Sequence, residues 1–271
     1  MNRGLIYKSV REVWPAVVVV GSGLFAVQIL FAHVLPTFYK DLAENLLQVE
    51  FIRKMISAFL GSDAGAAIGP AAMSAMAWAH PIVLALVWSL TIMICTRVPA
   101  GEVDRGTIDV LLSLPVTRTN VYLSETLVWF FSGAAVIALG FCGNVVGGWS
   151  IETRLSGTAA HRAWVSANLF ALYVAVGGAA WLASALCDRR GRAVGIVLGI
   201  LIASFVLNFL AAFNETVKHF SFLSVMDYYR PLLILQGGAK PFRDISTLLF
   251  VGAACWILGA FVFARRDVRT V

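Results

Sequence analysis

The chain of 271 residues is 59% hydrophobic and only 13% charged, which is about half the share of charged residues in soluble domains. This composition argues against an ordinary soluble enzyme and predicts an integral membrane protein. The formal net charge of +6 is explained by arginines at cytoplasmic loop ends. No Lys/Arg-rich run is interleaved with aromatic residues, so nucleic acid is not expected as a partner. The four cysteines lack metal-ligand spacing, and we expect neither a metal site nor disulfides.

The first fifteen residues carry three basic side chains among apolar ones. Arg3, Lys8 and Arg11 alternate with apolar positions at helical spacing, so residues 1–15 are predicted to form an interfacial helix lying on the membrane. A signal peptide is the alternative interpretation. No small-x-small cleavage pattern follows, and the next apolar run is long enough to span the membrane.

Six segments have roughly the 20 mostly apolar residues that cross a hydrocarbon core. The predicted spans are about 16–36, 77–96, 121–147, 165–187, 193–213 and 246–264. His80-Pro81 is expected to open the second helix. The outer segments are 37–69, with a surface helix expected over 39–60 because its apolar residues recur at helical spacing, and 214–245. The fold class is therefore all-α, a single transmembrane domain over residues 1–271.

The distribution of basic residues sets the orientation. Segments 1–15, 97–120, 188–192 and 265–271 hold 12 Lys and Arg in 51 residues, whereas the segments on the other side hold nine in 81. The denser set is expected in the cytoplasm. Both termini and the loop 97–120 are therefore predicted to be cytoplasmic.

The loop contains the polar stretch of the chain with the clearest residue pattern, "GEVDRGTIDVLLSLPVTR" at 101–118. Gly106 can break a turn, Thr107 is a good N-cap residue, and Pro115 stops the run. The apolar face between them consists of Ile108, Leu111, Leu112 and Leu114. A helix of about two turns is too short to be stable alone, so something must pack on it. Leucines exposed to the cytosol at this point are predicted to be a docking surface.

This stretch resembles the signature of ABC type-2 permeases, an acid-x-acid-x-Gly-Thr pattern followed by leucines and Leu-Pro-Val-Ser/Thr-Arg. The matching residues are Glu102, Asp104, Gly106, Thr107, Leu111, Leu112, Leu114, Pro115, Val116, Thr117 and Arg118. "HPIV" at 80–83 and "MDYYRPLLILQGG" at 226–238 resemble family stretches more loosely. With six spans and both termini inside, the resemblance extends over essentially the whole chain.

The resemblance implies a pair of permeases, expected to be a homodimer, with two ATPase subunits docked below, and membrane lipid around it. The loop would be the coupling helix, with an ATPase-docking set of Glu102, Asp104, Arg105, Gly106, Thr107, Ile108, Leu111, Leu112 and Pro115. The alternative is that the loop packs only against the span ends of its own chain. The sequence has no G-x-x-x-x-G-K-[ST] phosphate loop, so the chain is expected to bind no cofactor, with ATP and Mg²⁺ on the partner ATPase.

Small residues recur every fourth position along the fifth span, at Gly191, Gly195, Gly199 and Ala203. Such a stripe lets helices approach closely, and it predicts either a dimer seam or packing against another helix of the same chain. Glu125 lies about one turn inside the third span. Intramembrane acids are costly, and this carboxylate is expected to reach the cytosolic face or pair with Arg118.

The leading hypothesis is the membrane-spanning subunit of an ABC exporter in the cell (inner) membrane, with no catalytic residues of its own. The few charges within the spans favour an amphipathic or lipid-like substrate. The alternatives are a secondary transporter, which would usually show related repeats in its two halves, and an intramembrane enzyme or assembly factor. Both alternatives predict activity without an ATPase partner.

Overall fold

The computed structural model describes residues 3–45, 50, 70–113, 115–149, 158–237 and 240–266. Within these ranges every regular element is helical. The longer helices are α1 (Arg3–Asn45), α3 (Pro70–Ala79), α4 (Pro81–Cys95), α7 (Arg118–Trp149), α8 (Ala159–Leu186), α9 (Arg190–Ala211) and α12 (Phe242–Arg265). The short elements are η1 (Arg97–Gly101), α5 (Glu102–Asp104), α6 (Ile108–Ser113), α10 (Glu215–Lys218), η2 (Ser221–Leu223), η3 (Val225–Tyr228) and α11 (Pro231–Leu235).

Six helical stretches are long and apolar enough to cross a membrane. They are Arg3–Leu35, Ala71–Cys95, Arg118–Trp149, Ala159–Leu186, Arg190–Ala211 and Phe242–Arg265. Their number agrees with the six predicted spans, and the first and second candidates begin earlier in the chain than predicted, at Arg3 and Ala71. His80 opens α4 as expected, because its Nδ1 accepts a hydrogen bond from the Ile82 amide at 3.2 Å and Pro81 stands at the first helical position.

The first span differs from the prediction because no separate interfacial helix precedes it. α1 continues unbroken from Arg3 through Pro15 into the apolar segment. Its first turns are held by contacts with distant parts of the chain: Leu5 is buried beside the loop that follows α4, and Ser9 bonds a carboxylate on α7. These contacts stabilise the first turns of α1 within the bundle. The predicted surface helix over 39–60 overlaps the end of α1, and most of it lies outside the described residues.

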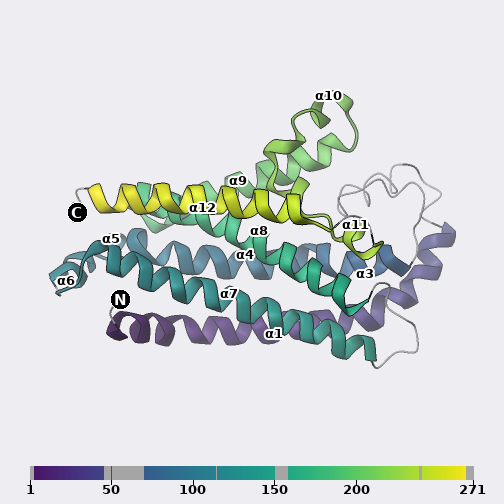
Figure 1. The fold of residues 1–271 in the computed structure, drawn as a ribbon, viewed down its shortest axis with the longest axis horizontal. Coiled ribbons are helices and arrows are strands. Elements are labelled where there is room, and N and C mark those ends of the chain that lie inside the picture. The colour runs from purple at the N-terminus through teal and green to yellow at the C-terminus, as the bar shows by residue number, and fades with distance from the viewer. Residues whose placement is uncertain are drawn as a thin grey trace.

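The long helices run lengthwise beside one another (Figure 1), with α1 packed along α7 and α8 packed along α12. Both chain termini lie at the same end of the bundle, and α5 and α6 project beyond that end. We call it the terminal end. α3 and α11 lie toward the opposite end, and α10 stands away from the bundle.

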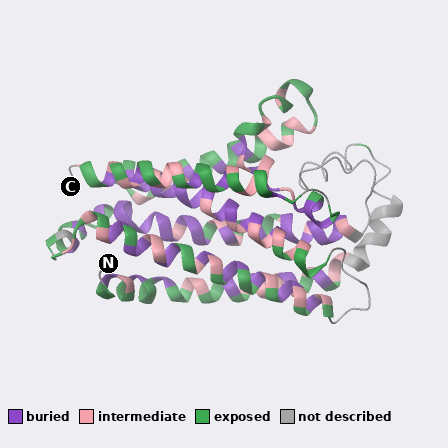
Figure 2. Ribbon diagram, in the orientation of Figure 1, coloured by how far each residue is buried: buried purple, intermediate pink, exposed green. Residues whose placement is uncertain are grey.

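α8 forms the centre of the bundle, as the concentration of buried residues on it indicates (Figure 2). Tyr173 and Trp181 are fully buried on this helix. The Tyr173 hydroxyl donates to the Trp129 carbonyl at 2.7 Å and its ring stacks on Trp129. By contrast, α9 and α12 expose most of their apolar surface, as expected of helices that face lipid or another protein.

Candidate functional site: the loop between α4 and α7

The loop between α4 and α7 folds as three short pieces in sequence. η1 is an irregular turn in which Val98 is extended, and α5 adds a single turn. Gly106 then adopts φ +68°, a left-handed conformation that glycine takes at little cost. This residue reverses the chain so that α6 begins directly afterwards. The prediction of a glycine break followed by a short helix is therefore confirmed.

Thr107 serves the loop differently from the expected N-cap. Its hydroxyl donates to the Glu102 carboxylate, closing the α5–α6 turn from within. The Thr107 carbonyl accepts from the Leu111 amide at 3.1 Å, which starts the α6 ladder. Thr107 therefore holds the start of α6 to Glu102 of α5.

Ile108 and Leu111 are not the exposed anchors that the sequence predicted. Their exposed fractions are 0% and 7%. They pack in a small cluster with Leu5, Val98, Val103 and Val121. A two-turn helix needs tertiary support, and α1 supplies it. The Leu112 side chain and Leu114 lie outside the described residues.

The exposed surface of the loop consists of other residues. Val110 is 69% exposed, and Asp109 and Ser113 flank it in the open. The predicted docking residues that are exposed are Asp104, Arg105, Gly106, Thr107 and Pro115. The surface is therefore polar, with one apolar side chain at its tip.

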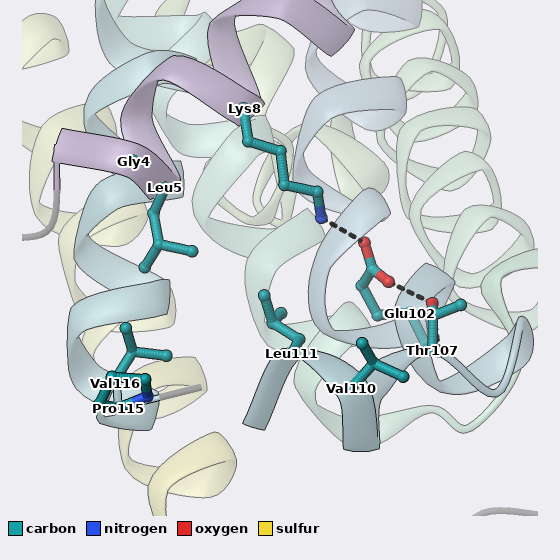
Figure 3. Close-up of a pocket in the computed structure, with 9 residues that line it drawn as sticks. All are labelled: Gly4, Leu5, Lys8, Glu102, Thr107, Val110, Leu111, Pro115 and Val116. Carbon is teal, nitrogen blue, oxygen red and sulfur yellow. Dashed lines mark hydrogen bonds and ion pairs between the residues drawn. The ribbon is translucent and has the colours of Figure 1, made fainter. Parts of the chain in front are cut away.

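A cavity of about 380 Å³ lies beside the contact between α6 and the start of α1 (Figure 3). Its lining consists of Gly4, Leu5, Lys8, Glu102, Thr107, Val110, Leu111, Pro115 and Val116. Leu5, Val110, Leu111, Pro115 and Val116 supply apolar lining, whereas Lys8 and Glu102 point toward one another. The cavity shows that α1 and the loop form one surface at the terminal end.

Glu102 is the polar centre of this surface. Although it is only 4% exposed, its carboxylate receives Lys8 Nζ at 3.3 Å, Arg105 Nη2 at 3.2 Å and the Thr107 hydroxyl. Burial raises the pKa of the Glu102 carboxyl, but the Thr107 hydrogen bond and the two cations outweigh burial and leave the pKa below its ordinary value. Glu102 is therefore ionised at neutral pH and orders the loop from inside.

Arg190 ties the loop to the start of α9. Its backbone amide donates to Asp104 at 3.4 Å. Its guanidinium donates to the Thr96 hydroxyl at 3.3 Å and to the Met93 carbonyl at 3.1 Å. Asp104 is therefore partly engaged within its own chain.

Arg97 is the partner of Glu125, and the expected pair with Arg118 is wrong. The Arg97 guanidinium bonds Glu125, Glu12 and the Ser9 hydroxyl. Arg118 instead donates to backbone carbonyls at the end of α12. The Glu125 carboxylate faces α1 and η1, and the buried cation that it meets there is Arg97.

Sequence reasoning missed Ser9, Glu12 and Arg97 as members of this site. Two signals pointed to Glu12 and Arg97, and none to Ser9. Lys8 and Glu12 have the i, i+4 spacing of a helical ion pair and lie 3.7 Å apart. A glutamate inside a span also requires a buried cation, and Arg97 directly follows the end of the second span.

The stripe of small residues on α9 faces outward. A Cβ built on Gly191, Gly195 or Gly199 meets no described atom within 4 Å, and Ala203 is exposed. Packing against another described helix of the same chain is therefore excluded.

The described residues contain no group of three or more His, Cys, Asp or Glu side chains that could hold a metal ion. The described side chains of the loop and of the start of α1 are held by hydrogen bonds, ion pairs and apolar contacts.

Comparison with known proteins agrees with the loop signature. The search of curated proteins gives no match. The model of the ABC-2 family transporter proteins matches residues 10–268, which is nearly the whole chain and includes the loop, five whole spans and the first span from residue 10 onward. The chain therefore belongs to the ABC-2 transporter family and is a permease of that type.

Proposed function

We propose that this permease is the membrane-spanning subunit of an ABC exporter driven by ATP that separate subunits hydrolyse. The observation that carries the proposal is the position of the family-type loop: α5 and α6 project from the bundle at the terminal end. The sequence contains no phosphate loop, so ATP and Mg²⁺ would bind the partner ATPase. Two copies of that ATPase would serve a pair of permeases.

The density of basic residues supports a cytoplasmic terminal end. The segments with 12 Lys and Arg in 51 residues have their described parts at this end, and cytoplasmic loops carry such an excess. A cytosolic ATPase would then meet α5, α6 and the first turns of α1. The membrane would be the cell (inner) membrane.

The docking contact differs in detail from the one that the sequence suggested. We infer that the ATPase contacts the exposed tip at Val110 together with Arg105 and Pro115, while Ile108 and Leu111 support the loop from inside. Leu112 remains a predicted contact. Asp104 and Glu102 would orient the loop through bonds within the chain.

A second permease subunit would cover α9. Its exposed surface combines the glycine stripe with Ile196, Ile200 and Ile202, and small residues let helices pack closely in lipid. A homodimer joined along this helix is the arrangement we favour. Few charges lie within the spans, which favours an amphipathic or lipid-like substrate.

The test is copurification from the native membrane with the Val110→Asp variant. A charge at the exposed tip should remove the ATPase while leaving the fold intact, because Val110 is 69% exposed. The matched control is Leu223→Asp, which introduces the same charge at a 65% exposed leucine in η2.

The expected result is a soluble ATPase that accompanies the wild type and the control and is lost from Val110→Asp. A well-folded permease that never brings down an ATPase would contradict the exporter proposal and favour a secondary transporter or an intramembrane enzyme. An ATPase that stays bound to Val110→Asp would show that it contacts another part of the terminal end.

A further inference from the structure

Alternating charges form a continuous ladder at the terminal end of the bundle. Each side chain is paired with the next: Glu125 with Arg97, Arg97 with Glu12, Glu12 with Lys8, Lys8 with Glu102, and Glu102 with Arg105. Three negative and three positive groups balance one another. The ladder begins on α7, crosses the first turns of α1 and ends in the loop, so it joins three segments that are far apart in sequence.

The two ends of the ladder have different characters. The side chains of Arg97 and Glu125 are only 10% and 7% exposed, and breaking a buried pair of this kind is costly. Lys8 is 44% exposed and lies between two carboxylates, 3.7 Å from Glu12 and 3.3 Å from Glu102. Exposed ion pairs are weak, so the Lys8 link is the weaker of the two, and a substitution can remove it while the link through Arg97 stays in place.

Lys8 is also the point where α1 meets the loop. In Figure 3 its side chain extends from α1 across the cavity to the Glu102 carboxylate. Leu5, one turn earlier, packs with Ile108 and Leu111 of α6. The charge pair and the two leucines line the same cavity.

We propose that Lys8 is a positioning residue for coupling, because its pair with Glu102 makes the first turns of α1 move together with α5 and α6. Arg97 then carries that displacement to α7 through Glu125. The inference rests on the proposed function, since the displacement would come from the docked ATPase. It adds a second route into the bundle, through α1 and α7, besides the direct chain connections of the loop.

The test measures the distance between α1 and α6 in the full-length permease in lipid nanodiscs. Nitroxide labels are attached at Tyr7→Cys and Ser113→Cys, both at exposed positions, after the four native cysteines are replaced by alanine. Lys8→Met removes the charge and keeps the length of the stem. Arg11→Met is the matched control, because Arg11 is exposed on α1 and has no ion pair among the described residues.

In the wild type and in Arg11→Met we expect one narrow distance distribution, unchanged when ATP and vanadate trap the copurified ATPase. In Lys8→Met a longer-distance population should grow severalfold, up to about fivefold for the loss of one partly exposed pair. Adding Lys8→Met to Glu102→Gln should then change nothing further, since the two residues act through one contact. If Lys8→Met and Arg11→Met have equal thermal stability, the change in distance comes from lost positioning and not from a weakened fold.

Identical distributions for Lys8→Met and Arg11→Met would overturn the inference. So would a Tyr7–Ser113 distance that changes on nucleotide trapping in the wild type. If no ATPase copurifies, the proposed function fails, and the comparison in the nucleotide-free permease still decides whether Lys8 holds α1 to the loop.

Discussion

Gly178 of α8 and Gly252 of α12 lie in direct backbone contact. A Cβ built on Gly178 would stand 2.1 Å from the Gly252 carbonyl oxygen, and one built on Gly252 would stand 2.6 Å from the Val174 carbonyl oxygen. Neither obstacle is a flexible side chain, so neither can rotate away. This contact sets the separation of α8 and α12 at the centre of the bundle, in the way small residues do between membrane helices.

Gly178→Ala should therefore destabilise the permease by about 1–3 kcal/mol, the usual cost of overpacking. The control is Gly23→Ala, whose added Cβ meets only Leu86 at 4.0 Å; alanine there should be neutral or stabilise the helix by up to ~1 kcal/mol. Thermal unfolding in one detergent measures both variants. A Gly178→Ala protein as stable as the control would show that the two helices separate freely.

Replacing Arg97 alone should cost more than replacing it together with its buried partner. Arg97→Met leaves the Glu125 carboxylate buried without its cation, which typically costs about 3–5 kcal/mol. In the double variant Arg97→Met/Glu125→Met no charge is left unpaired at this position, and most of the loss should be recovered. The Ser9 hydroxyl, 2.8 Å from Glu125, compensates little because it is neutral. Unfolding midpoints of the two single variants and the double variant measure the coupling; additive losses would contradict it.

Glu102 predicts how stability depends on pH. Its folded pKa lies below the ordinary value of 4.5 because Thr107, Lys8 and Arg105 favour the carboxylate over burial. A group with a lowered folded pKa contributes stability above its unfolded pKa and loses that contribution as the pH falls through the folded pKa. The stability difference between wild type and Glu102→Gln should thus be constant from neutral pH to about pH 5 and shrink below pH 4.5.

Thermal unfolding of the two proteins across that range is the measurement. Asp109→Asn is the matched control, since Asp109 is an exposed carboxylate on the same loop. A difference between wild type and Glu102→Gln that persists unchanged at the lowest pH would show that the charge of Glu102 contributes nothing to the loop.

The sequence predicted the elements whose cause is local. Span lengths follow from the thickness of the bilayer, and the start of α4 follows from Pro81 and the cap at His80. The break before α6 follows from Gly106, since the left-handed conformation that it adopts favours glycine.

The errors concern contacts between distant segments. α1 continues as one helix past Pro15, and its first turns bind residues about 90 to 120 positions away, such as Arg97 and Glu125. Arg118 looked like the partner of Glu125 because it is two helical turns away in sequence. The apolar face of α6 was recognised, but nothing local indicated that Leu5 would cover Ile108. A single sequence gives residue types and spacing, and these pairings depend on the tertiary arrangement.

The open stripe on α9 gives a prediction for the permease pair. No described atom lies within 4 Å of a Cβ built on Gly195, so Gly195→Leu should leave the fold of one chain unaffected. If α9 meets its copy through close glycine contacts, the leucine side chains will hold the helices apart and weaken the dimer about tenfold or more, the effect of a 1–3 kcal/mol clash. Ile196→Phe is the matched control, since it enlarges a side chain that is already 46% exposed on the same helix.

Mass photometry of both variants in nanodiscs, across a dilution series, reports the dimer fraction. Loss of the dimer in Gly195→Leu alone would identify the stripe as the contact. Both positions are open in the single chain, so a difference between the two variants must come from the dimer. A dimer that survives Gly195→Leu and dissociates in Ile196→Phe would move the seam to the neighbouring face of α9. The glycines would then serve a neighbour other than the second permease.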